Sequence, residues 1–151
     1  VAYDLRFIAT VLKFVTDLER IGDKAVSIAK RAKDVAAHRP PPVFDQLAAM
    51  SVAAQAMLRS ALDAFVSGDA ARAEEVLCRD DEVDRLRDEV RDQTVAWMHL
   101  STENIDAGLA VLSVGRHLER VADHATNLAE QVVFLVRGDD VRHRSHPPRG
   151  E

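Results

Sequence analysis

Hydrophobic side chains recur every three or four positions through most of this chain, the spacing that places them on one face of an α-helix. The pattern begins near residue 4 and continues to about residue 37, which predicts a helix about 50 Å long at a rise of about 1.5 Å per residue. Its apolar stripe consists of Leu5, Ile8, Leu12, Val15, Leu18, Val26 and Ala29. The stretch "HRPPPVFD" at residues 38–45 ends the helix, because proline has no N–H and disfavours a helical residue before it.

Three further helices are expected after the prolines. The first covers about residues 43–66, and the "SGD" that follows joins a glycine that can end a helix to an aspartate that can cap the next. The second covers about residues 70–99, and "LSTEN" then supplies Ser101 or Thr102 as the cap of a last helix that runs to about residue 137. Residues 138–151 have almost no apolar side chains, so we expect them to be disordered. The sequence predicts an all-α protein of long antiparallel helices.

One helical motif occurs twice. "DLERIGDKAVSIAKR" at residues 17–31 returns as "HLERVADHATNLAEQ" at residues 117–131, with Leu, Glu, Arg, Asp and two Ala residues repeated at an offset of 100. Such an offset indicates duplicated three-helix units. We therefore expect residues 1–38 to be the last helix of an incomplete first unit, 39–45 to be a linker and 43–137 to be a complete second unit. Because the chain begins with Val1 and is helical almost at once, we expect it to be a fragment that lacks two upstream helices.

Composition narrows the class of protein. The 151 residues are 47% hydrophobic and 30% charged but only 5% aromatic, which is typical of a helical protein with one sizeable core. The net charge of −5, with basic and acidic residues mixed along the chain, disfavours direct nucleic-acid binding. The chain has neither an apolar run long enough to span a bilayer nor a signal sequence, so we expect a cytoplasmic protein with no membrane insertion. The single cysteine, Cys78, is expected to be a reduced and packed thiol.

Carboxylates are the candidate functional groups. Glu119 and Asp123 lie one helical turn apart on the apolar side of their helix, and Asp80 and Asp84 have the same spacing on the preceding helix. Burying an unpaired carboxylate costs on the order of several kcal/mol. A bound metal or a basic side chain must offset this cost. Four oxygen ligands from two antiparallel helices suit Mg²⁺, Mn²⁺ or Fe³⁺. The alternative is a set of salt bridges, for which five arginines are near enough in sequence: Arg79, Arg85, Arg87, Arg116 and Arg120.

The first copy of the motif offers a second pair, Glu19 and Asp23, at the equivalent positions near the centre of the first apolar stripe. The histidines that flank the motif are not repeated, because Asp17 stands at the position of His117 and Lys24 at the position of His124. We therefore do not expect either histidine to be a repeated ligand.

The doubled motif, together with "YDLRFIATVLKFVTDLERIGD" at the start and "DDEVDRL" in the middle, resembles the PhoU family of phosphate-transport regulators. The resemblance implies two three-helix bundles in a cytoplasmic negative regulator of phosphate uptake and of the phosphate-starvation response. It implies contacts with the ATPase of a phosphate ABC transporter and with a sensor histidine kinase. It also implies a cluster of metal ions, with iron, manganese, magnesium and zinc as candidates. The implied ligands are Asp80, Asp84, Glu119 and Asp123 at the second cluster and Glu19 and Asp23 at an incomplete first cluster.

Three hypotheses follow. The first is a non-catalytic regulator, because the sequence has no evident nucleophile, phosphate loop or nucleotide-binding motif. The second is a di-iron enzyme, which is disfavoured because no glutamate is followed three positions later by histidine. The third is a metal-free structural module of a transporter or another regulator. In each case the apolar stripe of the first helix needs a partner, so we expect either a homodimer or the packing of this helix on the three-helix unit as a four-helix bundle.

Overall fold

The computed structural model describes residues 2–36 and 41–138, and every regular element in these ranges is helical. The elements are α1 (Ala2–Ala36), α2 (Phe44–Ser67), α3 (Ala70–Leu77), α4 (Asp80–Met98), the short 3-10 helix η1 (Thr102–Asn104) and α5 (Ile105–Arg137). The all-α prediction is confirmed. The tail expected to be disordered, from residue 139 onward, and residues 39 and 40 of the linker lie outside the described residues. Within those residues, no helix combines the length and the apolar content that crossing a bilayer requires.

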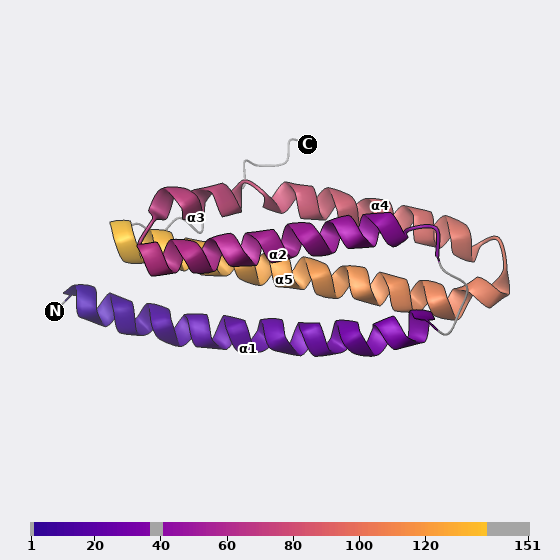
Figure 1. Cartoon of the computed structure of the whole chain (residues 1–151), viewed down its shortest axis with the longest axis horizontal. Helices are drawn as coiled ribbons and strands as arrows, with labels where there is room; N and C mark the ends of the chain where they lie inside the picture. Colours follow the sequence, from indigo (N-terminus) through magenta and orange to yellow (C-terminus); the bar gives the residue numbers. More distant parts are fainter. Residues whose placement is uncertain (1, 37–40, 139–151) are drawn as a thin grey trace, which may run out of the picture.

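Helix α5 is the central element of the bundle. Figure 1 shows α5 running between α1 on one side and α2, α3 and α4 on the other, and α5 packs against all four. Its fully buried Leu128, Val132 and Val133 share one apolar cluster with Met50 and Met57 of α2. Burial of one such side chain contributes about 1.5–3 kcal/mol, so this cluster is the main source of stability. The chain thus forms a bundle around the second copy of the repeated motif.

Small residues on α5 allow α4 to approach it closely. A Cβ atom placed on Gly115 would lie 3.6 Å from Val90 Cγ1, and one placed on Gly108 would overlap Met98 Cγ. Close approach of the two helices brings the polar side chains beside this seam within reach of one another. Gly108 and Gly115 of α5 therefore help to position the candidate site.

The helix predicted for residues 70–99 is divided into α3 and α4. Asp69 caps α3, its side chain accepting a hydrogen bond from the Arg72 N–H at 3.0 Å. The helix ends at Cys78, and a new one starts with the acidic run Asp80, Asp81 and Glu82. Negative charge is favourable at a helix N-terminus, which is a physical reason for the restart. The exposed thiol of Cys78 lies at this break, so the prediction that it is packed is wrong.

Helix α1 packs antiparallel on α5, in agreement with the four-helix alternative, but it does so with an unexpected face (Figure 1). Phe14 is buried and its ring centroid lies 4.2 Å from that of Phe65. The predicted stripe is open instead: Leu5 is 69% exposed, Leu12 65% and Val15 59%. The α1 sequence carries two apolar stripes, and the one with Phe14 is the one that finds partners on α5 and α2. Dimerisation through the open stripe stays a prediction.

Candidate functional site

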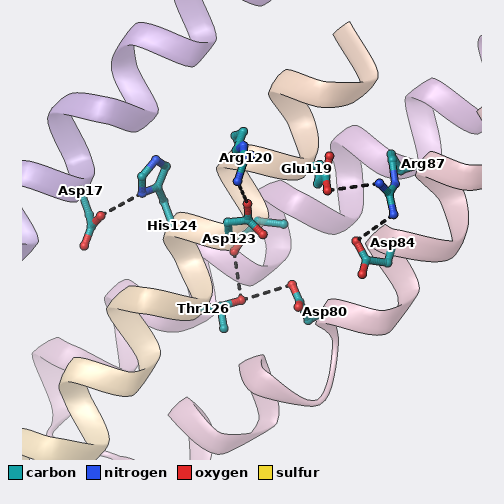
Figure 2. A network of polar contacts seen from close by, with 10 residues as sticks. Asp17, Asp80, Asp84, Arg87, Glu119, Arg120, Asp123, His124 and Thr126 are labelled. Atoms are coloured by element: carbon teal, nitrogen blue, oxygen red, sulfur yellow. Dashed lines mark hydrogen bonds and ion pairs between the residues drawn. The ribbon is translucent and has the colours of Figure 1, made fainter. Parts of the chain in front are cut away.

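The carboxylates of the second repeat lie along the seam between α4 and α5, as the sequence predicted. Two contacts fix the register: Thr126 Oγ1 donates to Asp80 Oδ1 at 3.4 Å, and Arg87 Nη1 lies 3.4 Å from Glu119 Oε1. Asp80, the first residue of α4, therefore lies beside Thr126 of α5. The next turns of α4 lie beside residues that come earlier in α5, because the two helices are antiparallel. Figure 2 shows Asp80, Asp84, Glu119 and Asp123 distributed along this seam.

Asp80 is the carboxylate whose ionisation is opposed most clearly. Partial burial raises the pKa of Asp80 above its usual 3.8, and the negative charges of Asp84 and Asp123 raise this pKa further. The hydrogen bond from Thr126 acts in the opposite direction, while Asp81 adds a smaller increase in the pKa. Among the described residues, no basic side chain forms an ion pair with Asp80. Asp80 thus lies in a negative environment, and it has no cationic partner of its own among the described residues.

Arginines neutralise the other carboxylates. Figure 2 shows Arg87 between Glu119 and Asp84, with Nη1 3.4 Å from Glu119 and Nη2 3.8 Å from Asp84. Arg120 Nη1 donates to Asp123 Oδ2 at 2.9 Å. The salt-bridge alternative therefore describes three of the four carboxylates. Within the described ranges, no group of three or more His, Cys, Asp or Glu side chains has an arrangement that would hold a metal ion.

The donor set still suits a hard cation in its chemistry. A surface cavity of about 340 Å³ is lined by Asp80, Asp123, Thr126, Asn127, His124 and Arg120. Carboxylate, hydroxyl and amide oxygens are ligands that Mg²⁺ and Mn²⁺ accept. Arg120 occupies part of the same cavity, so a cation would have to replace its contact with Asp123. These residues fit a metal only after that exchange.

The first copy of the motif has no such surroundings. Glu19 and Asp23 are exposed, and within the described residues α1 packs against α5 without a helix equivalent to α4 opposite this pair. The expectation that Glu19 faces the core is wrong, because the whole stripe that contains it is open. The expectation that this pair is incomplete remains a prediction.

A polar pair that the sequence did not predict joins α1 to α5. His124 Nδ1 lies 2.8 Å from Asp17 Oδ1, and each side chain is only 12% exposed. Lys13 Nζ donates to Gln131 Oε1 at 3.3 Å one turn away. The signal was present in the repeat, because Asp17 and His124 stand at two of the positions that differ between the copies, and these positions meet when the copies pack antiparallel.

Comparison with known proteins relates the sequence to one domain family. Residues 1–32 and 47–132 match the PhoU domain. A phosphate-specific transport system accessory protein PhoU homolog of Pseudomonas putida is 40% identical over 143 residues, which is 94% of this chain and 56% of the relative. The homolog of Clostridium acetobutylicum is 36% identical over 93% of this chain and 64% of the relative. The chain thus spans less than two thirds of the length of these relatives.

Solved structures agree with this relation. The crystal structure of PhoU from Pseudomonas aeruginosa superposes with a TM-score of 0.88 at 38% identity, covering 92% of this chain and 67% of the other. The phosphate transport system regulatory protein PhoU from Streptococcus pneumoniae gives a TM-score of 0.84 at 30% identity, covering 92% of this chain and 66% of that one. Both the helices and their arrangement are therefore those of the matched structures.

Proposed function

Because this chain belongs to the PhoU family, we propose that it is a non-catalytic regulator of phosphate uptake that acts through contacts with other proteins. The observation that carries this proposal is the similarity to phosphate-specific transport system accessory proteins over 94% of the chain. The doubled acidic helix motif, which is preserved in α1 and α5, supports it. We further propose that the chain acts in the cytoplasm as a negative regulator of the phosphate-starvation response.

The proposed partners are the ATPase of a phosphate ABC transporter and a sensor histidine kinase. The start of α4 offers a surface for such contacts, because Asp81 and Glu82 are exposed beside the carboxylate seam. The open stripe of α1 offers an apolar surface, and exposed apolar patches commonly mark interaction sites. A charged and an apolar surface on opposite parts of the bundle would allow two partners to bind.

Capture of the partners tests the regulatory role. The tagged chain is expected to retain the transporter ATPase or the cytoplasmic part of the kinase, and not the ATPase of an unrelated transporter used as the control. The expected Kd is in the micromolar range, which corresponds to a binding free energy of about −8 kcal/mol. If a well-folded chain retains neither partner, the regulatory proposal is wrong and the structural-module alternative is favoured.

We also propose that Asp80, Asp84, Glu119 and Asp123 bind a metal ion or a small cluster of ions. Binding requires that Arg87 releases Asp84 and Glu119 and that Arg120 releases Asp123. Bound metal would replace the charge of these arginines and offset the repulsion that Asp84 and Asp123 exert on Asp80. Iron, manganese, magnesium and zinc are candidates, and the oxygen-only donor set favours the harder ions. A specific observation favours the metal-free alternative: the pairs of Arg87 with Glu119 and of Arg120 with Asp123 already neutralise two of these groups.

Thermal unfolding with added Mn²⁺ distinguishes these alternatives. A ligand at about 100 times its Kd stabilises the folded state by about 2.7 kcal/mol, which raises Tm by roughly 5–10 °C in a chain of this size. We expect this increase in the unaltered chain and in Glu19→Gln, and its loss in Asp80→Asn. No rise in Tm with any of the four metals would contradict the metal proposal and leave the partner proposal standing.

The pH dependence gives the sign of the electrostatic effect at Asp80. The pKa of Asp80 is higher in the folded chain than in the unfolded one, so ionised Asp80 disfavours the fold at neutral pH. This penalty disappears as the pH falls through the raised pKa of Asp80. Without metal, Asp80→Asn should therefore raise the free energy of unfolding at pH 7. The increase should be well below about 1 kcal/mol, because the side chain is partly exposed and solvent screens its charge. Metal should bind more weakly as the pH approaches that pKa, because the metal must then displace a proton.

A further inference from the structure

A second surface cavity lies along the seam between α4 and α5, and its volume is about 380 Å³. Its apolar wall is formed by Val90, Leu112 and Gly115. A Cβ atom on Gly115 would lie 3.6 Å from Val90 Cγ1, so a larger residue there would fill part of this space. The polar wall combines four arginines with one glutamate, namely Arg87, Arg91, Arg116, Arg120 and Glu119. The groups that line the cavity thus carry an excess of positive charge.

The repeat shows that this cavity is a feature of the second copy. Gly115 and Arg116 of α5 correspond to Val15 and Thr16 of α1 at the offset of 100 residues. The first copy therefore has neither the small residue of the apolar wall nor the arginine that follows it. Duplication of the helix motif alone does not account for the arginines, which favours a role specific to α4 and α5.

Three of the four arginines are already engaged in ion pairs. Arg87 Nη1 lies 3.4 Å from Glu119 Oε1, and Arg120 Nη1 lies 2.9 Å from Asp123 Oδ2 (Figure 2). Further ion pairs on α4 join Arg87 and Arg91 to Asp84, Asp88 and Asp92. Arg116 forms no ion pair with a described residue. The positive charge of the cavity is therefore compensated as long as these pairs are intact.

Two of these arginines can change partners at little cost. Arg120 lines both this cavity and the neighbouring one that contains Asp123, so it stands between the two. The side chains of this pair are 59% and 38% exposed, and ion pairs with such exposure contribute little stability. Arg87 lines the cavity as well, and it also contacts Asp88 on its own helix. Neutralisation of Glu119 and Asp123 would therefore free two guanidinium groups that already border the cavity.

We propose that Arg87, Arg116 and Arg120 form a closed binding site for an acidic segment of a partner protein. The site opens when Glu119 and Asp123 no longer compete for two of these arginines. A carboxylate accepts paired hydrogen bonds from a guanidinium group, which suits the polar wall. Burial of apolar surface suits the other wall, and it favours a carboxylate that stands beside an apolar side chain over a hydrated inorganic ion.

A cation on the carboxylate seam is one way to open the site, and this step rests on the metal binding proposed above. The cation takes the carboxylates of Glu119 and Asp123, and it thereby releases the arginines that the acidic segment needs. Because the two ligands favour the same arrangement of Arg87 and Arg120, each raises the affinity for the other by the same factor. The seam would then couple the presence of a cation to the capture of a partner.

Neutralisation of the two carboxylates tests the site without any metal. Fluorescence anisotropy measures the binding of a short labelled peptide that contains glutamate beside leucine. The double variant Glu119→Gln/Asp123→Asn should bind this peptide about tenfold or more tightly than the unaltered chain does, the effect of one charge-assisted hydrogen bond. A peptide with glutamine in place of glutamate should show no such difference. Asp45→Asn/Glu75→Gln is the matched control, because it removes equal charge from exposed side chains that form no ion pair with a described residue.

Further substitutions in the Glu119→Gln/Asp123→Asn chain locate the site. Arg116→Gln should abolish the gain in affinity, whereas Arg85→Gln should preserve it, because Arg85 lies on α4 without lining the cavity. Circular dichroism verifies that the variants are folded. Equal affinity in the unaltered chain and the double variant, or an equal gain in the charge control, would overturn the proposal. Binding of inorganic phosphate as tight as that of the peptide would also overturn it, because the occupant would then be a free oxyanion.

Addition of Mg²⁺ to the unaltered chain separates this proposal from metal binding. Mg²⁺ should produce the same gain in peptide affinity as the double variant, and Asp80→Asn in the same buffer should reduce it. If the double variant gains affinity but neither Mg²⁺ nor Mn²⁺ changes the unaltered chain, the arginine site is supported and the metal proposal is contradicted. If metal raises Tm but the double variant gains no affinity, metal binding is supported and the arginine site is wrong.

Discussion

Replacement of Phe14 by alanine is expected to detach α1 from the bundle while α2–α5 stay folded. Phe14 is only 4% exposed and lies in contact with Phe65 of α2, whereas most large apolar side chains of α1 face solvent. Truncation of a buried phenylalanine costs about 3–5 kcal/mol. The remaining buried residues of α1 include Thr10, Asp17 and Val35, which bury much less apolar surface. Local release is therefore less costly than unfolding of the core around Leu128.

Hydrogen exchange measured along the chain distinguishes local release from global unfolding. In Phe14→Ala, amides of α1 should lose their protection by a factor of about 100 or more, while those of α5 near Leu128 keep theirs. Leu12→Ala is the matched control, because Leu12 lies on the same helix but is 65% exposed, and its effect should stay within about 0.5 kcal/mol. Equal loss of protection in α1 and α5 would show instead that the whole bundle unfolds as one unit.

The second large effect is expected at the pair Asp17 and His124. Each side chain is 12% exposed, so removal of one leaves a shielded polar partner without its contact. Asp17→Ala should reduce the free energy of unfolding by about 1–3 kcal/mol, the cost of leaving a shielded polar group without its hydrogen-bond partner. Urea unfolding of Asp17→Ala, His124→Ala and the double variant measures the coupling between them.

The coupling free energy in this cycle should be about 1–3 kcal/mol. Asp23→Ala is a suitable control, because Asp23 lies on the same helix with an exposed side chain and should have little effect. If the effects of Asp17→Ala and His124→Ala add without coupling, the contact does not hold α1 on α5. The stability of the helix pair would then depend on Phe14 and its neighbours alone.

Local signals in the sequence predicted several of the helix ends, although not the break between α3 and α4. Gly68 adopts a left-handed conformation with φ of 65°, as expected of the glycine in "SGD". Asp69 caps the next helix. Ser101, which was expected to cap the last helix, instead caps the short η1 before it, accepting a hydrogen bond from the Glu103 N–H at 3.2 Å, and α5 starts after Asn104 without a side-chain cap. Each of these features depends on interactions within a few residues, so the sequence alone contains the information needed. The acidic run at the start of α4 is also a local signal, but a helix start was not expected there.

Features that depend on the register between helices were harder to predict. The spacing of Leu5, Leu12 and Val15 shows that they share a face but not whether that face has a partner. In the same way, the sequence placed Glu119 beside the seam, yet only the offset between α4 and α5 determines that Arg87 contacts it at 3.4 Å. The pair Asp17 and His124 likewise requires knowledge that the two copies pack antiparallel. Sequence periodicity does not contain this information, because it describes each helix separately.

The exposed thiol at the break between α3 and α4 has a practical consequence. Cys78 is the one cysteine among the 151 residues, and it lies two positions before Asp80. A maleimide dye or spin label would therefore attach at a single known point without any substitution. Its fluorescence or line shape would report on the junction beside the carboxylate seam, and paramagnetic Mn²⁺ bound there would broaden or quench the signal. The chain thus carries its own spectroscopic attachment point next to the site where a cation is proposed to bind.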